Sequence, residues 1–154
     1  LTPGEPGWLP STEALLMNAA RDEHLGRLIR PALKAGKWVL CDRFCDSTIA
    51  YQSAGGAEVA SLLDLQDRVV GETMPDLTIL LDADPRDLLA RRQARGGSDA
   101  FELRDIAFHD DVRSVFLQLA KQNSERVTKF DALQNPQDLA RQVCDLISRK
   151  WSLA

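Results

Sequence analysis

The chain has 154 residues, a formal net charge of −4, 44% hydrophobic and 27% charged residues, a balance that fits one globular domain with a buried core. The acidic excess argues against a nucleic acid polymer as partner, although a few converging arginines can still bind a small anion. No run of 18 apolar residues predicts a membrane span, and the first residues lack the basic and apolar regions of a signal peptide.

The cysteines favour unpaired thiols. Cys41 and Cys45 have a C-x3-C spacing, but no second ligand pair follows and both histidines are distant in sequence. We therefore expect a protein of the reducing cytoplasm without a zinc site.

The first ten residues hold three prolines and two glycines and predict an irregular loop. A long helix is predicted next, capped by Ser11 or Thr12, running to about Ala35 and ended by Gly36. Its apolar residues recur at helical spacing: Leu15, Leu16, Ala19, Ala20, Leu28, Ile29, Ala32 and Leu33. The apolar run 37–41 then predicts a parallel strand buried on both faces.

Helices and strands alternate through the rest of the chain. After a polar loop over 42–47 and a short segment through Tyr51, we predict helices over 57–72, from Pro85 to the Gly96-Gly97 pair, over 103–121 and over 136–150, and strands over 76–82 and 127–130. Asp84 and Asn135 are the expected N-caps, each followed by proline. The pattern predicts an α/β fold with a parallel sheet flanked by helices.

Asp42 and Arg43 follow the first predicted strand, where ligands of open parallel sheets bind. An acid beside an arginine can hold Mg²⁺ through water and clamp a phosphoryl group; a surface ion pair is the alternative. Ser47, Thr48, Tyr51 and Gln52 come next on the chain. These donors and acceptors fit the binding of a flat heterocycle and a sugar; the alternative is that they only cap helices and stabilise turns.

Two further groups have the same ambiguity. Met17 and Arg21 share a helical face, which fits a surface under a base with a donor to its carbonyl, or a solvated face. Arg91 and Arg95 share another face just before Gly96-Gly97. They fit a lid that brings positive charge to transferring phosphates, or a helix end stabilised by its dipole.

An ordered set of motifs resembles bacterial thymidylate kinases over nearly the whole chain. The motifs are Thr12-Glu13-Ala14-Leu15-Leu16, Ala19-Ala20-Arg21, Ile29-x-Pro31-Ala32-Leu33, Val39-x-x-Asp42-Arg43-Phe44, Ser47-Thr48-x-Ala50-Tyr51-Gln52, Pro75-Asp76-Leu77-Thr78, Leu80-Leu81-Asp82 and Arg91-x-x-x-Arg95-Gly96. The resemblance implies a single P-loop kinase-like domain over 1–154, a lid over about 91–103 and a cytoplasmic homodimer. It also implies transfer of the γ-phosphoryl group of ATP to dTMP with Mg²⁺.

The resemblance also implies residue roles. Asp42 and Arg43 match the pair that organises Mg²⁺ and the dTMP phosphate, and Arg21 the arginine that reads the thymine carbonyl. The remaining matches are Thr48 and Gln52 beside the base, Tyr51 beside the sugar, and Arg95, with Arg91 nearby, on the ATP phosphates.

The sequence departs from that family in three places. Met17 stands where many members have a phenylalanine that stacks on thymine, and Ala100 where the lid often has an arginine. The N-terminal P-loop segment is missing, since Gly36-Lys37 is only a partial match with Trp38 at the Ser/Thr position. Alternatives are therefore an inactive fragment that keeps the dTMP side and the dimer helices, or another pyrimidine nucleoside or nucleotide kinase.

Overall fold

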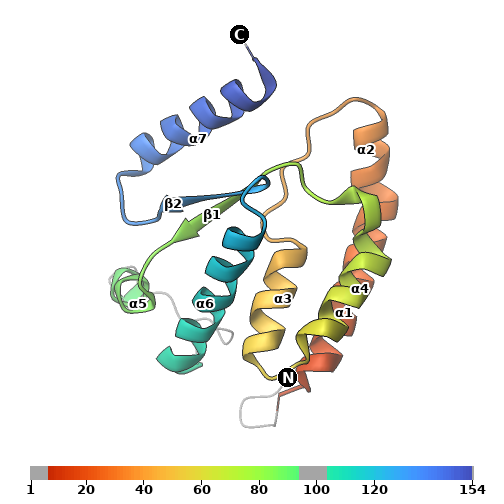
Figure 1. Ribbon diagram of the computed structural model, residues 1–154, viewed down its shortest axis with the longest axis vertical. Coiled ribbons are helices and arrows are strands. Elements are labelled where there is room, and N and C mark those ends of the chain that lie inside the picture. Colours follow the sequence, from red (N-terminus) through yellow and green to blue (C-terminus); the bar gives the residue numbers. More distant parts are fainter. Residues whose placement is uncertain (1–6, 94–103, 154) are drawn as a thin grey trace. The chain divides into compact units, whose positions relative to one another are not determined.

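A computed structural model describes residues 7–93 and 104–153 (Figure 1). The chain divides into two compact units, one made of the residues up to Pro75 with Ser114–Phe116, the other of Asp76–Arg113 with the residues from Leu117. None of the helices over the described ranges has the length and apolarity that a membrane crossing requires.

The first unit begins with the long predicted helix, which the structure divides into three parts. They are α1 (Pro10–His24), the π turn η1 (Leu25–Ile29) and α2 (Arg30–Lys34). The predicted cap at Ser11 or Thr12 is wrong: α1 starts at Pro10, whose ring presets the first helical turn, and Leu9 at the cap position gives no side-chain hydrogen bond. In the π turn the Arg30 N–H bonds to the Leu25 carbonyl, five residues back.

Gly36 ends this helix as predicted. It has φ +70°, and its N–H donates to the Leu33 carbonyl at 2.9 Å. The Lys37 N–H donates to the Ala32 carbonyl at 3.0 Å, which completes the Schellman pattern of bonds. A residue without a Cβ suits this left-handed position.

The inward face of the helix differs from the apolar pattern in the sequence. Ala14, Asn18, Leu25 and Ile29 are buried. Of the eight apolar positions singled out above, Ile29 alone is buried and Ala32 is half-buried, while Leu15 and Leu28 are 60% and 61% exposed. Apolar spacing identified the helix but not its buried face.

The first unit is completed by α3 (Cys45–Ala54), α4 (Val59–Val70) and the single 3₁₀ turn η2 (Gly71–Thr73). Helices α1, α3 and α4 pack against one another (Figure 1). Their core is formed by Leu25, Ile29, Cys45 and Val70 with Val39, Phe44, Val69 and Met74 packed around it. Arg30 at the start of α2 donates to the Val69 carbonyl in α4 and to Thr73 Oγ1 in η2, both at 3.0 Å, and so links these elements.

The predicted strand over 37–41 is wrong. The segment is irregular, Trp38 is 64% exposed and Leu40 is fully exposed, although Val39 packs against the core. A strand requires a neighbouring backbone to pair with, and no segment of the described ranges pairs with this one. The helix that follows starts at Cys45, inside the predicted polar loop.

The second unit contains the parallel sheet that the sequence predicts. Its elements are β1 (Thr78–Asp82), α5 (Pro85–Gln93), α6 (Ile106–Gln122), β2 (Val127–Asp131) and α7 (Pro136–Trp151). The strands β1 and β2 pair in parallel, from Thr78 opposite Val127 to Asp82 opposite Asp131 (Figure 1). This pairing confirms the α/β class.

Both predicted caps of the second unit are confirmed. Asp84 Oδ1 accepts from the Arg86 N–H and Asn135 Oδ1 from the Gln137 N–H, each at 2.9 Å. Asp105 caps α6 in the same way by accepting from the Phe108 N–H. The lid predicted over about 91–103 falls mainly on 94–103, which lie outside the described residues.

Candidate functional site

Arg21 is the centre of a polar cluster in the first unit. Its Nη1 donates to Asn18 Oδ1 at 2.7 Å, and its Nη2 donates to Thr48 Oγ1 at 2.8 Å and to the Phe44 carbonyl at 3.2 Å. The guanidinium carbon lies 5.3 Å from the centre of the Phe44 ring, within cation–π range. We call Asn18, Arg21, Phe44 and Thr48 the Arg21 cluster.

All hydrogen-bond acceptors in the Arg21 cluster are uncharged. Burial lowers the pKa of Arg21, an effect opposed by the Cys45, Cys41 and Asp46 side chains. An arginine stays protonated at neutral pH even when its pKa falls. The cluster therefore holds a positive charge to which none of the described carboxylates is directly hydrogen-bonded.

Helix α3 carries the predicted base-binding residues and contributes Thr48 to the Arg21 cluster. Thr48 and Gln52 are four residues apart on α3 and are 5% and 4% exposed. Gln52 Nε2 donates to Glu13 Oε2 on the first turn of α1 at 3.1 Å. Ser47 is half-buried in the first turn of α3, where its N–H donates to the Phe44 carbonyl.

Arg43 and Tyr51, which flank Phe44 and Thr48 of the Arg21 cluster in the sequence, also contact each other. The Arg43 guanidinium carbon lies 5.3 Å from the centre of the Tyr51 ring. Arg43 has φ +59°, a left-handed conformation that costs a non-glycine residue about 1–2 kcal/mol. Such a cost is met at binding sites more often than elsewhere, and here it lies in the predicted Asp42-Arg43 pair.

Asp42 and Arg43 are both exposed. A single exposed carboxylate fits a magnesium ion that keeps most of its waters and takes other ligands from substrate phosphates. Over residues 7–93 and 104–153, no group of three or more His, Cys, Asp or Glu side chains converges on a metal position. The Asp42 carboxylate could hold a hydrated Mg²⁺ through water in this way.

Cys41 lies just before this pair and is a free, half-buried thiol. Burial raises the pKa of its thiol, and the neighbouring Asp42 raises it further, against the opposite effect of Arg21. The protonated thiol donates to the Arg43 carbonyl at 3.4 Å. This weak bond supports the left-handed turn.

The other predicted site residues are placed as follows. Met17 is 44% exposed, one turn before Arg21 on α1. In the second unit Arg91 Nη1 donates to the Ala132 carbonyl at 3.0 Å. Arg95 lies outside the described residues.

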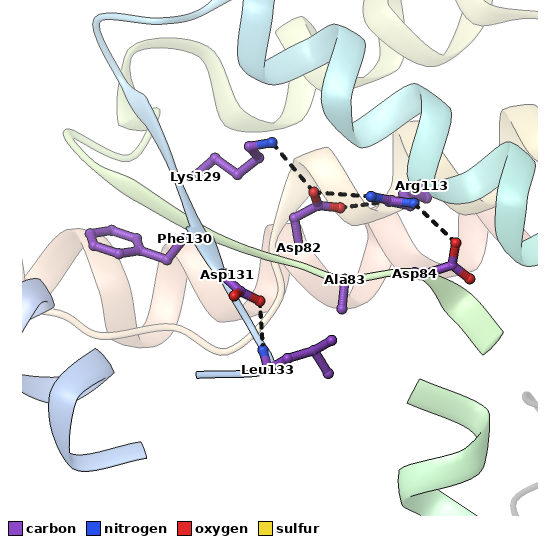
Figure 2. A pocket seen from close by; sticks show the side chains of 8 residues that line it. All are labelled: Asp82, Ala83, Asp84, Arg113, Lys129, Phe130, Asp131 and Leu133. Carbon is purple, nitrogen blue, oxygen red and sulfur yellow. Dashed lines mark hydrogen bonds and ion pairs between the residues drawn. The ribbon is translucent and has the colours of Figure 1, made fainter. Parts of the chain in front are cut away.

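The second unit has a charged pocket at the carboxyl ends of β1 and β2, with a volume of about 270 Å³ (Figure 2). Asp82 accepts from Arg113 Nε at 2.7 Å and Nη2 at 3.3 Å, and Lys129 Nζ lies 3.4 Å from the same carboxylate. These cations, Arg113 first, lower the pKa of Asp82. Arg113 also lies 3.8 Å from Asp84.

Sequence reasoning missed several residues of both places. Asn18 and Glu13 are polar residues of the first helix to which the sequence analysis gave no role. The position of Asn18, three residues before Arg21, was the available signal, because such pairs meet on a helix. Asp82 ends a predicted strand, but nothing in the sequence marked Arg113 as its partner.

Comparisons with known proteins all match the chain to the same family. The family model described as thymidylate kinase matches residues 7–143. The chain is 43% identical over 147 residues to the thymidylate kinase of Caulobacter vibrioides, covering 95% of this chain and 71% of that protein. It is 48% identical over 132 residues to that of Magnetococcus marinus, covering 84% and 63%.

A solved structure from the same family also resembles the chain. The crystal structure of thymidylate kinase from Ehrlichia chaffeensis matches with a TM-score of 0.64 and 31% identity, over 82% of this chain and 61% of that one. The chain thus spans roughly three fifths to seven tenths of the length of these proteins.

Proposed function

Because the chain belongs to the thymidylate kinase family, we propose that it serves the phosphorylation of dTMP by ATP and supplies the dTMP-binding side of that reaction. The observation that carries the proposal is the Arg21 cluster, a partly buried cation held by neutral acceptors. Such a group is suited to donate to a ligand carbonyl. The same geometry disfavours an amino group, whose own donors would face the guanidinium.

The polar residues around Arg21 extend this proposal to the rest of the nucleotide. Thr48 and Gln52 lie on one face of α3 and border the position proposed for the base, with Ser47 at the start of that helix. Met17, exposed one turn before Arg21, offers a flexible thioether surface to the ring. Tyr51 lies on the same helix and contacts Arg43, so the sugar and phosphate are proposed to follow in that direction.

In the proposed reaction an oxygen of the dTMP phosphate attacks the γ-phosphorus of ATP, and the bond to the β–γ bridging oxygen breaks, which gives dTDP and ADP. Such transfers depend on positioning and on neutralising charge. Arg43 would orient the dTMP phosphate, and Asp42 would hold a water of hydrated Mg²⁺, which supplies positive charge to the phosphates when bound. Arg95, with Arg91, is proposed to act on the ATP phosphates.

A homodimer is also proposed. The outward face of the long first helix carries large apolar side chains, including Leu15 at 60%, Leu16 at 43% and Leu28 at 61% exposure. Burying such side chains is favourable by roughly 25 cal/mol per Å² of apolar surface. Sedimentation velocity measures the expected dimer, and Leu28→Glu should shift it to monomer.

A second candidate is a chain that binds dTMP without turning it over. It is favoured by one observation: the Arg21 cluster, which carries the proposal, supports binding of the base and takes no part in the transfer itself. The two candidates share the dTMP side and differ in catalysis. Another pyrimidine kinase activity would differ from both in the base it selects.

One experiment separates these candidates. Binding of dTMP, dCMP and dUMP is measured by calorimetry on the intact protein that carries residues 1–154, and ADP formation is followed with ATP and each nucleotide. We expect dTMP to bind best, with ADP formation if the protein is the kinase and none if it only binds. Equal binding of dCMP and dTMP would refute the proposed base selection.

Arg21→Ala tests the residue that carries the proposal. It should weaken dTMP binding and narrow the preference for dTMP over dCMP. Arg27→Ala is the matched control, since Arg27 is on the same helical run but exposed and paired with Glu23. Similar losses from both substitutions would count against a role of Arg21 at the base.

A further inference from the structure

Asn18 is a buried amide inside α1, with 2% exposure. Asparagine is less favourable in a helix interior than alanine or leucine, and a buried amide must be hydrogen-bonded. Both polar atoms of Asn18 have partners: Nδ2 donates to the Ala14 carbonyl at 2.9 Å, and Oδ1 accepts from Arg21 Nη1 at 2.7 Å. Both polar atoms of this residue, which is unfavourable in a helix, are therefore hydrogen-bonded, one to a carbonyl of the same helix and the other to Arg21.

These two bonds allow only one orientation of the amide. A backbone carbonyl can only accept and a guanidinium can only donate. If the Asn18 amide flipped, its NH₂ would face the N–H donors of Arg21 and its oxygen would face the Ala14 oxygen. The Ala14 carbonyl thus fixes the acceptor of Asn18 toward Arg21.

Arg21 has more N–H donors than its contacts in the cluster use. A guanidinium has five N–H donors. Three are used, by Asn18 Oδ1, Thr48 Oγ1 and the Phe44 carbonyl, and the described residues offer Arg21 no further acceptor. Two N–H donors are left for a ligand, on a group whose plane is held at both Nη atoms.

We propose that Asn18 is a positioning residue that orients Arg21 and so sets the preference for a pyrimidine with a 4-carbonyl over one with a 4-amino group. The proposal rests on the function proposed above, because it takes the ligand of Arg21 to be a thymine nucleotide. An uncharged acceptor is essential to it. It holds the guanidinium without neutralising the charge that the ligand carbonyl meets.

The test uses three variants of the intact protein that carries residues 1–154. Asn18→Leu removes the acceptor at similar size, and Asn18→Asp keeps an acceptor but adds a negative charge. Asn123→Leu is the control: Asn123 directly follows α6, and its Nδ2 donates to the Leu119 carbonyl four residues back at 2.9 Å, as Asn18 does to Ala14.

Two measurements test the proposal on each variant, and a third checks that the variant is folded. Hydrogen exchange of the Arg21 side-chain N–H groups, followed by NMR, reports orientation whether or not a nucleotide binds. Calorimetric titrations give the dissociation constants of dTMP and dCMP. Thermal unfolding shows which variants are folded.

We expect Asn18→Leu to speed the exchange of the Arg21 N–H groups and to raise the dTMP dissociation constant by roughly tenfold, which corresponds to about 1.4 kcal/mol. The dCMP constant should change little, so discrimination narrows. Asn18→Asp should keep slow exchange yet weaken dTMP binding, because its carboxylate neutralises the guanidinium. Asn123→Leu should match the unmutated protein in both measurements.

Unchanged Arg21 exchange in a folded Asn18→Leu variant would overturn the positioning role. If that variant does not fold, Asn18→Asp decides, and unchanged dTMP affinity there would overturn the proposal. If the unmutated protein binds neither nucleotide, the proposed function fails and the specificity role fails with it, while the exchange data still decide whether Asn18 orients Arg21.

Discussion

Asp82→Asn should destabilise the second unit in a way that depends on pH. Asp82 is 10% exposed and takes two hydrogen bonds from Arg113 and one contact from Lys129 (Figure 2). Hydrogen bonds to charged groups contribute about 1.5–3 kcal/mol each when protected. Arg113 is 35% exposed and Lys129 53%, so water screens both cations and the contribution is smaller.

We therefore expect Asp82→Asn to lower the free energy of unfolding by about 1–2 kcal/mol at pH 7, since the amide oxygen still accepts one bond. Urea unfolding followed by circular dichroism measures it. Asp110→Asn is the control, because its pair with Arg86 is exposed on both sides and should contribute nothing measurable.

The pH dependence tests the cause. The pKa of Asp82 is lowered in the folded state, chiefly by Arg113. Its stabilising effect is thus complete above the unfolded-state pKa of about 3.9 and is lost as pH falls through the lower folded-state pKa. The stability gap between the unmutated protein and Asp82→Asn should be constant from pH 7 to about 5 and should close in stronger acid. A gap that does not shrink once the pH falls below about 3.9, or a loss no larger than that of Asp110→Asn, would refute the ion-pair explanation.

Three other predictions each compare two substitutions. Gly36→Ala should lower the free energy of unfolding by about 1 kcal/mol, because Gly36 has a φ of +70°. Gly26→Ala should raise it by up to about 1 kcal/mol, because Gly26 lies inside the helix and nothing lies within 4 Å of the added Cβ. Chemical denaturation measures both changes. Asn135→Ala should cost about 1 kcal/mol by removing the cap of α7, again read from denaturation midpoints, and Asn135→Asp should cost less. In steady-state kinetics of the intact protein, Arg95→Ala should lower kcat by about 10²-fold and Arg92→Ala far less; equal effects would contradict a role of Arg95 at the phosphates.

Local signals in the sequence predicted the elements of the second unit well. Its caps, Asp84 and Asn135, each accept from the N–H two residues further on, and its strand 78–82 is an apolar run that ends before a turn. Such signals need no knowledge of the rest of the fold.

The failures in the first unit come from partners that lie outside a local window. The apolar run 37–41 predicts a strand only if another backbone pairs with it, and the described residues provide none. The face of α1 was misjudged for a similar reason, since the helix buries the polar Asn18 and leaves Leu15 exposed. The start at Pro10 is different, because that proline was itself a readable signal.

The candidate site was predicted in part. The sequence identified Arg21 and Thr48 separately, and the structure joins them by a hydrogen bond of 2.8 Å. It gave no indication that the Phe44 carbonyl would be the third acceptor, because a backbone group has no signature in the sequence. The left-handed conformation of Arg43 was also unforeseen, since arginine has no preference for it.

The π turn of η1 affects how related chains should be aligned. A π turn closes after one more residue than an α turn, so the helix takes in an extra residue between His24 and Arg30. A relative that is one residue shorter here can close the same stretch as an ordinary α turn and still present its counterparts of Arg21 and Arg30 in the same directions. A one-residue alignment gap at this place therefore marks a local change of helix type and leaves the equivalence of the flanking positions intact.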